Sequence, residues 1–104
     1  MGGVPEFRTR FDGELWEWSG DAAWYFISLP AEDADHIREL FGGRASGFGS
    51  VRVEVTIGSS RWRTSVFPDK ARDTYLLPVK KQIRVREQLA VGSIAAIELV
   101  VLVD

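Results

Sequence analysis

The 104-residue sequence contains no cysteine and only one histidine, His36. The absence of cysteine excludes disulfides, thiolate nucleophiles and cysteine-ligated zinc. A lone histidine excludes a multi-histidine metal site, and any serine triad would have to be built around His36. Because His36 lies between Asp35 and Ile37 in a predicted helix, we interpret it as a surface or boundary residue. The sequence therefore predicts a protein that is not an enzyme, with no catalytic residue, no metal and no cofactor.

Long apolar runs are also absent. The longest, at residues 99–103, is far too short to span a bilayer, and residues 1–10 contain no apolar signal region. We therefore expect no membrane contact and a cytoplasmic location. With 45% hydrophobic and 27% charged residues, the chain is typical of one globular domain over residues 1–104.

Charge is distributed unevenly, although the formal net charge is only −2. Residues 12–39 carry eight acidic side chains and one basic side chain, Arg38. Residues 61–86 carry eight basic side chains and two acidic ones, Asp69 and Asp73. The acidic pI of about 5.4 argues against a nucleic-acid partner, because duplex affinity comes largely from Lys and Arg that neutralise phosphates. The basic second half is nevertheless where a functional site is expected.

Alternation of apolar and polar residues predicts strands. In residues 6–16 it places Phe7, Phe11 and Leu15 on one side, and the aromatic run 23–29 returns as a hairpin partner. Residues 51–57 alternate strictly and turn at 58–60 into a partner strand at 61–67, which makes a second hairpin. Residues 75–77 predict a short strand, and the apolar, β-branched run 93–103 predicts a central strand.

Two short helices are predicted between these strands. The first starts at Pro30 and ends at Gly42, and the second opens at Pro78 with Val79 and Ile83 stacked one turn apart. The buried stripe of the first helix is expected to comprise Ala34, Ile37, Leu40 and Phe41. Its acidic residues, Glu32, Asp33 and Asp35, lack the pattern of a calcium-binding loop and are interpreted as a solvated helix start. The glycine-rich residues 43–49 lack a phosphate-binding motif and are interpreted as a connector.

The sequence contains an internal echo at an offset of 48 residues. This shift places Leu29-Pro30 on Leu77-Pro78 and Arg38-Glu39 on Arg86-Glu87. Both halves then show a hairpin, a Leu-Pro step, a short helix and a following strand. We therefore expect two pseudo-repeated halves, at about 4–42 and 50–104, that close a small barrel with a helix over each end.

The region from Val51 to Leu99, with its Thr64-Ser65, Phe67-Pro68 and Leu77-Pro78-Val79-Lys80 steps, resembles the bacterial domain-of-unknown-function family numbered nineteen-oh-five. The earlier run 24–30 fits the same family. The resemblance implies a mainly β fold, a single-chain double-split β-barrel of the kind found in the AbrB and MazE class of swapped-hairpin regulators. The sequence departs from the AbrB pattern at Gly92-Ser93, where an aspartate is missing. No activity follows from this resemblance.

The best candidate site is a basic set on the predicted strand 61–67 and the following helix. Its members are expected to converge beside the helix start, where backbone N–H groups are free, and to suit a phosphate or carboxylate. The set comprises Arg61, Arg63, Ser65, Lys80, Lys81 and Arg84. The alternative is that these residues form ion pairs with the acidic first half, within the chain or across a dimer.

Trp16 and Trp18 raise a separate question. Strict alternation places both on the face opposite Phe11 and Leu15, so that two tryptophans would face outward as a ligand or partner surface. The other interpretation, which we favour here, is a bulge after Gly13 that turns them inward.

Three functions remain open from the sequence. The first is a binding module for a small anion or an acidic partner, formed by the basic set. The second is DNA binding by analogy with the AbrB fold, although a fold does not determine function. The third is a self-associating structural or interaction domain, so that both a monomer and a homodimer stay possible.

Overall fold

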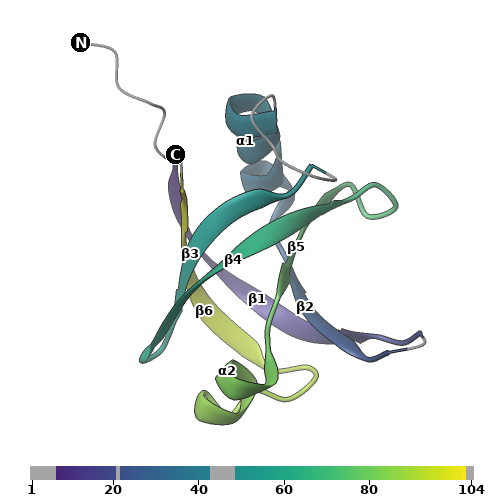
Figure 1. Cartoon of the computed structure of the whole chain (residues 1–104), viewed down its shortest axis with the longest axis vertical. Coiled ribbons are helices and arrows are strands. Elements are labelled where there is room, and N and C mark those ends of the chain that lie inside the picture. Colours follow the sequence, from purple (N-terminus) through teal and green to yellow (C-terminus); the bar gives the residue numbers. More distant parts are fainter. Residues whose placement is uncertain (1–6, 21, 43–48, 103–104) are drawn as a thin grey trace.

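The computed structural model describes residues 7–20, 22–42 and 49–102. These residues form the elements β1 (Arg8–Trp18), β2 (Trp24–Ser28), α1 (Ala31–Phe41), β3 (Val51–Ile57), β4 (Ser60–Asp69), β5 (Thr74–Pro78), α2 (Lys81–Arg86) and β6 (Ile94–Val101). The strands close into a barrel in the order β1-β2-β5-β4-β3-β6, and every neighbouring pair is antiparallel. Figure 1 shows α1 and α2 at opposite ends of this barrel. The prediction of a mainly β barrel with two short helices is confirmed. None of the described helices is long and apolar enough to cross a membrane.

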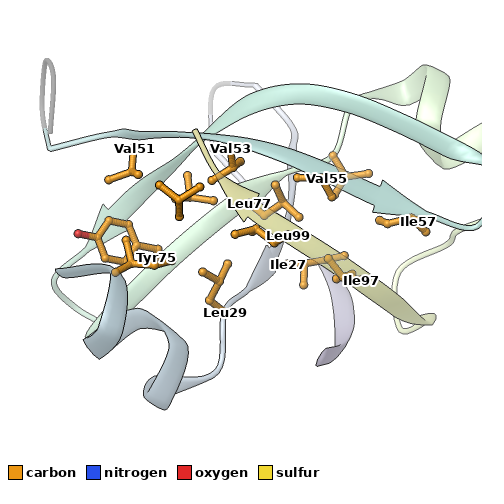
Figure 2. Packing of buried hydrophobic residues seen from close by; sticks show 14 of the residues in the cluster. Ile27, Leu29, Val51, Val53, Val55, Ile57, Tyr75, Leu77, Ile97 and Leu99 are labelled. Atoms are coloured by element: carbon orange, nitrogen blue, oxygen red, sulfur yellow. The ribbon is translucent and has the colours of Figure 1, made fainter. Parts of the chain in front are cut away.

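The barrel interior is filled by the apolar residues that alternate along the strands. Val53, Val55, Ile27, Leu77 and Leu99 are fully buried and meet in the centre (Figure 2). Since β-strand side chains alternate between two faces, the residues next to each of these point to the outer face of the barrel. The strict alternation of residues 51–57 is thus explained by one face that packs into the core and one that contacts solvent.

The two halves of the chain have equivalent topologies. If the labels β1, β2 and β3 are exchanged with β4, β5 and β6, the order of the strands around the barrel is unchanged. The two contacts between equivalent strands contain the pairs Ser28–Leu76 and Val53–Val101, each 48 positions apart in sequence. The offset of the internal echo is therefore also found in both contacts between equivalent strands. In this exchange β3 completes the first repeat and does not open the second.

Both helices differ in detail from their predictions. Pro30 precedes α1 as its N-cap, and Leu40 is 40% exposed, whereas Ala34, Ile37 and Phe41 are buried as expected. The second helix was predicted to open at Pro78, which is wrong: Pro78 ends β5, and α2 starts only at Lys81. Proline is tolerated at this position because it lacks a backbone N–H, and the end of β5 needs no hydrogen bond from that group to a neighbouring strand. The predicted connector, residues 43–49, lies outside the described residues except for Gly49.

The bulge expected after Gly13 is absent. β1 keeps one register with β6 from Arg8 to Glu14, and Leu15 continues it by donating its N–H to the carbonyl of Ser93. β1 then pairs with β2 from Leu15 to Trp18. Alternation consequently holds throughout the strand, so Trp16 is half-buried on the outer face and Trp18 is 44% exposed.

A carboxylate ties α2 to the β3–β4 turn. Glu87, the C-cap of α2, accepts hydrogen bonds from the hydroxyls of Ser60 at 2.6 Å and Ser59 at 3.2 Å. Ser60 is fully buried, so this bond satisfies a hydroxyl that has no access to water. These hydrogen bonds, the one from Ser60 above all, lower the pKa of Glu87 below its usual 4.5.

This contact predicts a specific acid sensitivity. Because the pKa of Glu87 is depressed in the folded state, its contribution to stability is complete above pH 4.5 and is lost as the pH falls through the folded-state pKa. We expect Glu87→Gln to be less stable than the wild type at pH 7 and the difference to shrink as the pH falls below 4.5. Urea unfolding of both proteins between pH 3 and pH 7 measures this difference. A stability gap independent of pH would contradict the assignment.

Candidate functional site

The barrel wall opens between β4 and β5 at the end covered by α2. Along β4, residues 60–66 pair with β3, but only residues 67–69 pair with β5. β5 instead pairs through residues 76–78 with β2, and Val79 donates its N–H to the carbonyl of Tyr25. In the described residues, the stretch of β4 from Arg61 to Val66 thus has no β5 partner, and the two strands diverge.

A pocket of about 450 Å³ occupies this divergence. Its volume falls in the range of small-molecule sites, roughly 300–1,000 Å³. It is lined by Ala23, Trp24, Tyr25, Trp62, Arg63, Thr64, Phe67, Pro78, Val79, Lys80, Lys81 and Arg84. The lining contains four cationic side chains and no carboxylate, so it carries a net positive charge. We call this cavity the basic pocket.

Four of the six residues predicted from the sequence line the basic pocket: Arg63, Lys80, Lys81 and Arg84. The other two do not. Arg61 is exposed on β4 opposite Thr56, and Ser65 is half-buried opposite Arg52; both share the outer face of β4 with Arg63, but neither lines the pocket. The helix start contributes less than expected as well, because α2 has only six residues and Lys80 is its N-cap.

The cations of the basic pocket are largely free of internal ion pairs. Arg63 lies 3.5 Å from the carboxylate of Glu54 on the neighbouring strand β3, and both side chains contact solvent. Among the ion pairs found in residues 7–20, 22–42 and 49–102, none involves Lys80, Lys81 or Arg84. These three side chains therefore do not form the ion pairs with the acidic first half that the sequence left open as an alternative.

Arg84 has the most unusual surroundings of the four. Its guanidinium carbon lies 3.7 Å from the centroid of the Tyr25 ring, which is a close cation–π contact. Its Nη1 atom is buried and has no hydrogen-bond partner. A buried N–H donor without an acceptor costs about 1–3 kcal/mol, which makes such an atom rare. The Tyr25 ring thus holds the positive charge of Arg84 at the wall of the basic pocket.

Sequence reasoning missed the aromatic part of the basic pocket. Trp24 is 52% and Phe67 is 43% exposed, and both lie at its mouth. The alternation of β4 already placed Phe67 on the face of Arg63, so this residue was within reach of the sequence. Trp24 and Tyr25 were not, because the contact of β2 with α2 depends on the pairing of β2 with β5, which joins distant parts of the chain.

No group of three or more potential metal ligands occurs in the part of the chain that the structure describes. The acidic residues at the start of α1 are engaged otherwise: Asp33 accepts a hydrogen bond from the Thr9 hydroxyl at 2.9 Å, and Asp35 pairs with Arg38 at 3.1 Å. His36 is exposed and its ring lies 5.7 Å from that of Phe7. This surface position is the one that the sequence predicted for His36.

These features define a small antiparallel β-barrel protein with a cationic pocket where its wall opens. Residues 11–99 match the family described as Domain of unknown function (DUF1905), so the chain is a member of it. No curated protein matches the chain in sequence.

Proposed function

We propose that this protein is a non-enzymatic binding module for an anionic ligand, and that the basic pocket is its site. The observation that carries the proposal is that four cationic side chains and no carboxylate line one pocket: Arg63, Lys80, Lys81 and Arg84. A hydrogen bond between charged groups is worth roughly 1.5–3 kcal/mol, so one anionic group held by several of these donors would bind with measurable affinity.

The test is anion binding by a charge-reversed variant. We expect pyrophosphate to raise the unfolding temperature of the wild type, because a ligand that binds only the folded state stabilises it. In Lys80→Glu/Lys81→Glu the affinity measured by calorimetry should fall by more than about tenfold, equivalent to ~1.4 kcal/mol. Citrate serves as a carboxylate probe under the same conditions.

A matched control separates the pocket from overall charge. Arg52→Glu/Arg61→Glu changes the net charge equally, but both residues are exposed and neither lines the basic pocket. We expect this control to bind pyrophosphate within about threefold of the wild type, the residual change coming from long-range electrostatics. Equal losses in both double variants, or no binding by the wild type, would contradict the proposal.

The finer fold assignment, a double-split β-barrel of the AbrB and MazE class, belongs to the same proposal. It is supported by the equivalence of the two halves and by the divergence of β4 from β5. DNA binding and self-association are outcomes of the same experiments. Duplex binding with a steep salt dependence would favour the DNA-binding alternative. A mass that rises with protein concentration at low salt but not at high salt would favour association through oppositely charged surfaces.

A further inference from the structure

We infer that the ligand of the basic pocket carries an aromatic ring beside its anionic group, as a nucleotide unit does. This inference rests on the proposed function and extends it from the charge of the ligand to its chemical class. It is carried by a second feature, an outward row of aromatic side chains that ends at the mouth of the basic pocket.

The aromatic row lies on the outer face of the β1–β2 hairpin. The rings of Trp16 and Phe26 are 5.4 Å apart and tilted, and those of Phe26 and Trp24 are 6.1 Å apart and nearly parallel at 6°. The Trp16 end is occupied: Trp16 donates a hydrogen bond to the Ser28 hydroxyl at 3.0 Å, and the Arg72 guanidinium covers its ring at 4.5 Å. The Trp24 end is open to solvent.

The open end adjoins the cations. A shallow depression of about 480 Å³ on the outer face is lined by Trp18, Trp24, Phe26 and Phe67, among others. Trp24 and Phe67 line both this depression and the basic pocket. Two half-exposed aromatic side chains therefore separate an aromatic surface from a cluster of four positive charges.

This juxtaposition fits one ligand chemistry well. A heteroaromatic base gains about 1–3 kcal/mol from stacking on a protein aromatic ring, and this gain depends little on which base it is. Its phosphate needs cationic donors a short distance away, which Arg63, Lys80, Lys81 and Arg84 supply. A purely inorganic anion would leave the aromatic surface without a use, and a purely apolar ligand would leave the charges unused.

The experiment compares ligands that share the anionic group. Calorimetry is carried out with pyrophosphate, ADP and a single-stranded hexanucleotide, on the wild type and on Trp24→Ala/Phe67→Ala. We expect ADP to bind the wild type about 5–150-fold more tightly than pyrophosphate, which is the stacking contribution expressed as a ratio. In the double variant this advantage should disappear, so that ADP and pyrophosphate bind it with about equal affinity. Quenching of tryptophan fluorescence by ADP, absent with pyrophosphate, provides a second measure.

Each outcome has a separate meaning. If pyrophosphate binds and ADP binds no more tightly, the inference fails and the proposed function stands. If neither binds, both fail. Tighter binding of ADP that survives in Trp24→Ala/Phe67→Ala would also overturn the inference, because the stacking surface would then lie elsewhere. Preference for the hexanucleotide over ADP would support the inference and identify a nucleic-acid strand as the source of the nucleotide unit. Unchanged unfolding temperatures of the variant without ligand show that these results do not reflect unfolding.

Discussion

We expect Gly13→Ala to destabilise this protein, and we expect no such destabilisation when Ile27 is replaced by alanine as well. A Cβ atom at position 13 would overlap the Cγ2 methyl of Ile27 and lie 3.3 Å from side-chain atoms of Phe11 and Ile97. Overpacking of a filled core costs about 1–3 kcal/mol. Ile27 is fully buried, so Ile27→Ala by itself should cost about 2–5 kcal/mol. Because the two sites touch, their effects should not add.

The double variant gives the decisive measurement. In Ile27→Ala, the new methyl group of Gly13→Ala enters space that the isoleucine has vacated, so Gly13→Ala/Ile27→Ala should be at least as stable as Ile27→Ala alone. Chemical denaturation of the four proteins yields the coupling energy. At about 4–8 °C per kcal/mol for a domain near this size, the shifts are also visible in thermal unfolding. Ile94→Ala, at a residue 63% exposed, is the control and should change stability by less than about 0.5 kcal/mol. Additive losses at positions 13 and 27 would contradict the packing described.

Much of the fold follows from local pattern in the sequence. Alternation correctly gave the inward faces of β1 and β3, because strand period and burial coincide there. The prediction was wrong at Trp16 and Trp18, where we set alternation aside and expected a bulge. A preference for burying tryptophan led to a bulge that the register with β6 does not contain. The start of α2 was misplaced for a related reason: proline is common both at the first turn of a helix and at the end of a strand, and only the pairing of Pro78 with Phe26 decides between them.

The candidate site was predictable in its charges but not in its boundaries. The sequence grouped Arg61, Arg63 and Ser65 because they share one face of β4, but alternation does not show how far along that face the pocket extends, and only Arg63 lines it. The internal repeat allows the two helix starts to be compared. Asp33 in α1 corresponds to Lys81 in α2 at the offset of 48, and Asp33 is bound by the Thr9 hydroxyl. The two equivalent helix starts thus differ: Asp33 accepts an internal hydrogen bond, whereas Lys81 forms no ion pair among the described residues.

Replacement of Arg84 by methionine separates ligand binding from folding. Methionine keeps the unbranched stem of the arginine side chain and can pack its sulfur against the Tyr25 ring. It removes the Nη1 donor that is buried without a partner, and thereby an unfavourable term of about 1–3 kcal/mol in the unliganded protein. The cation–π contact with Tyr25 is lost, at a cost of about 0.5–2 kcal/mol. We therefore expect Arg84→Met to be about as stable as the wild type in anion-free buffer, and to lose more than about 90% of its pyrophosphate affinity.

The matched control for this prediction is Arg86→Met, on the same helix but exposed and outside the basic pocket. It should leave both the stability and the pyrophosphate affinity nearly unchanged. Urea unfolding without anions and calorimetry with pyrophosphate measure the two quantities for each variant. If Arg84→Met lost more than about 2 kcal/mol of stability without ligand, Arg84 would have a structural role and its buried donor would not indicate a site. If it kept both its stability and its affinity, the anion would have to bind through the lysines alone. A buried cationic donor without a partner lowers stability, and we expect it to be retained where it serves a function. The unfolding free energies and pyrophosphate affinities of Arg84→Met and Arg86→Met measure this cost and this benefit.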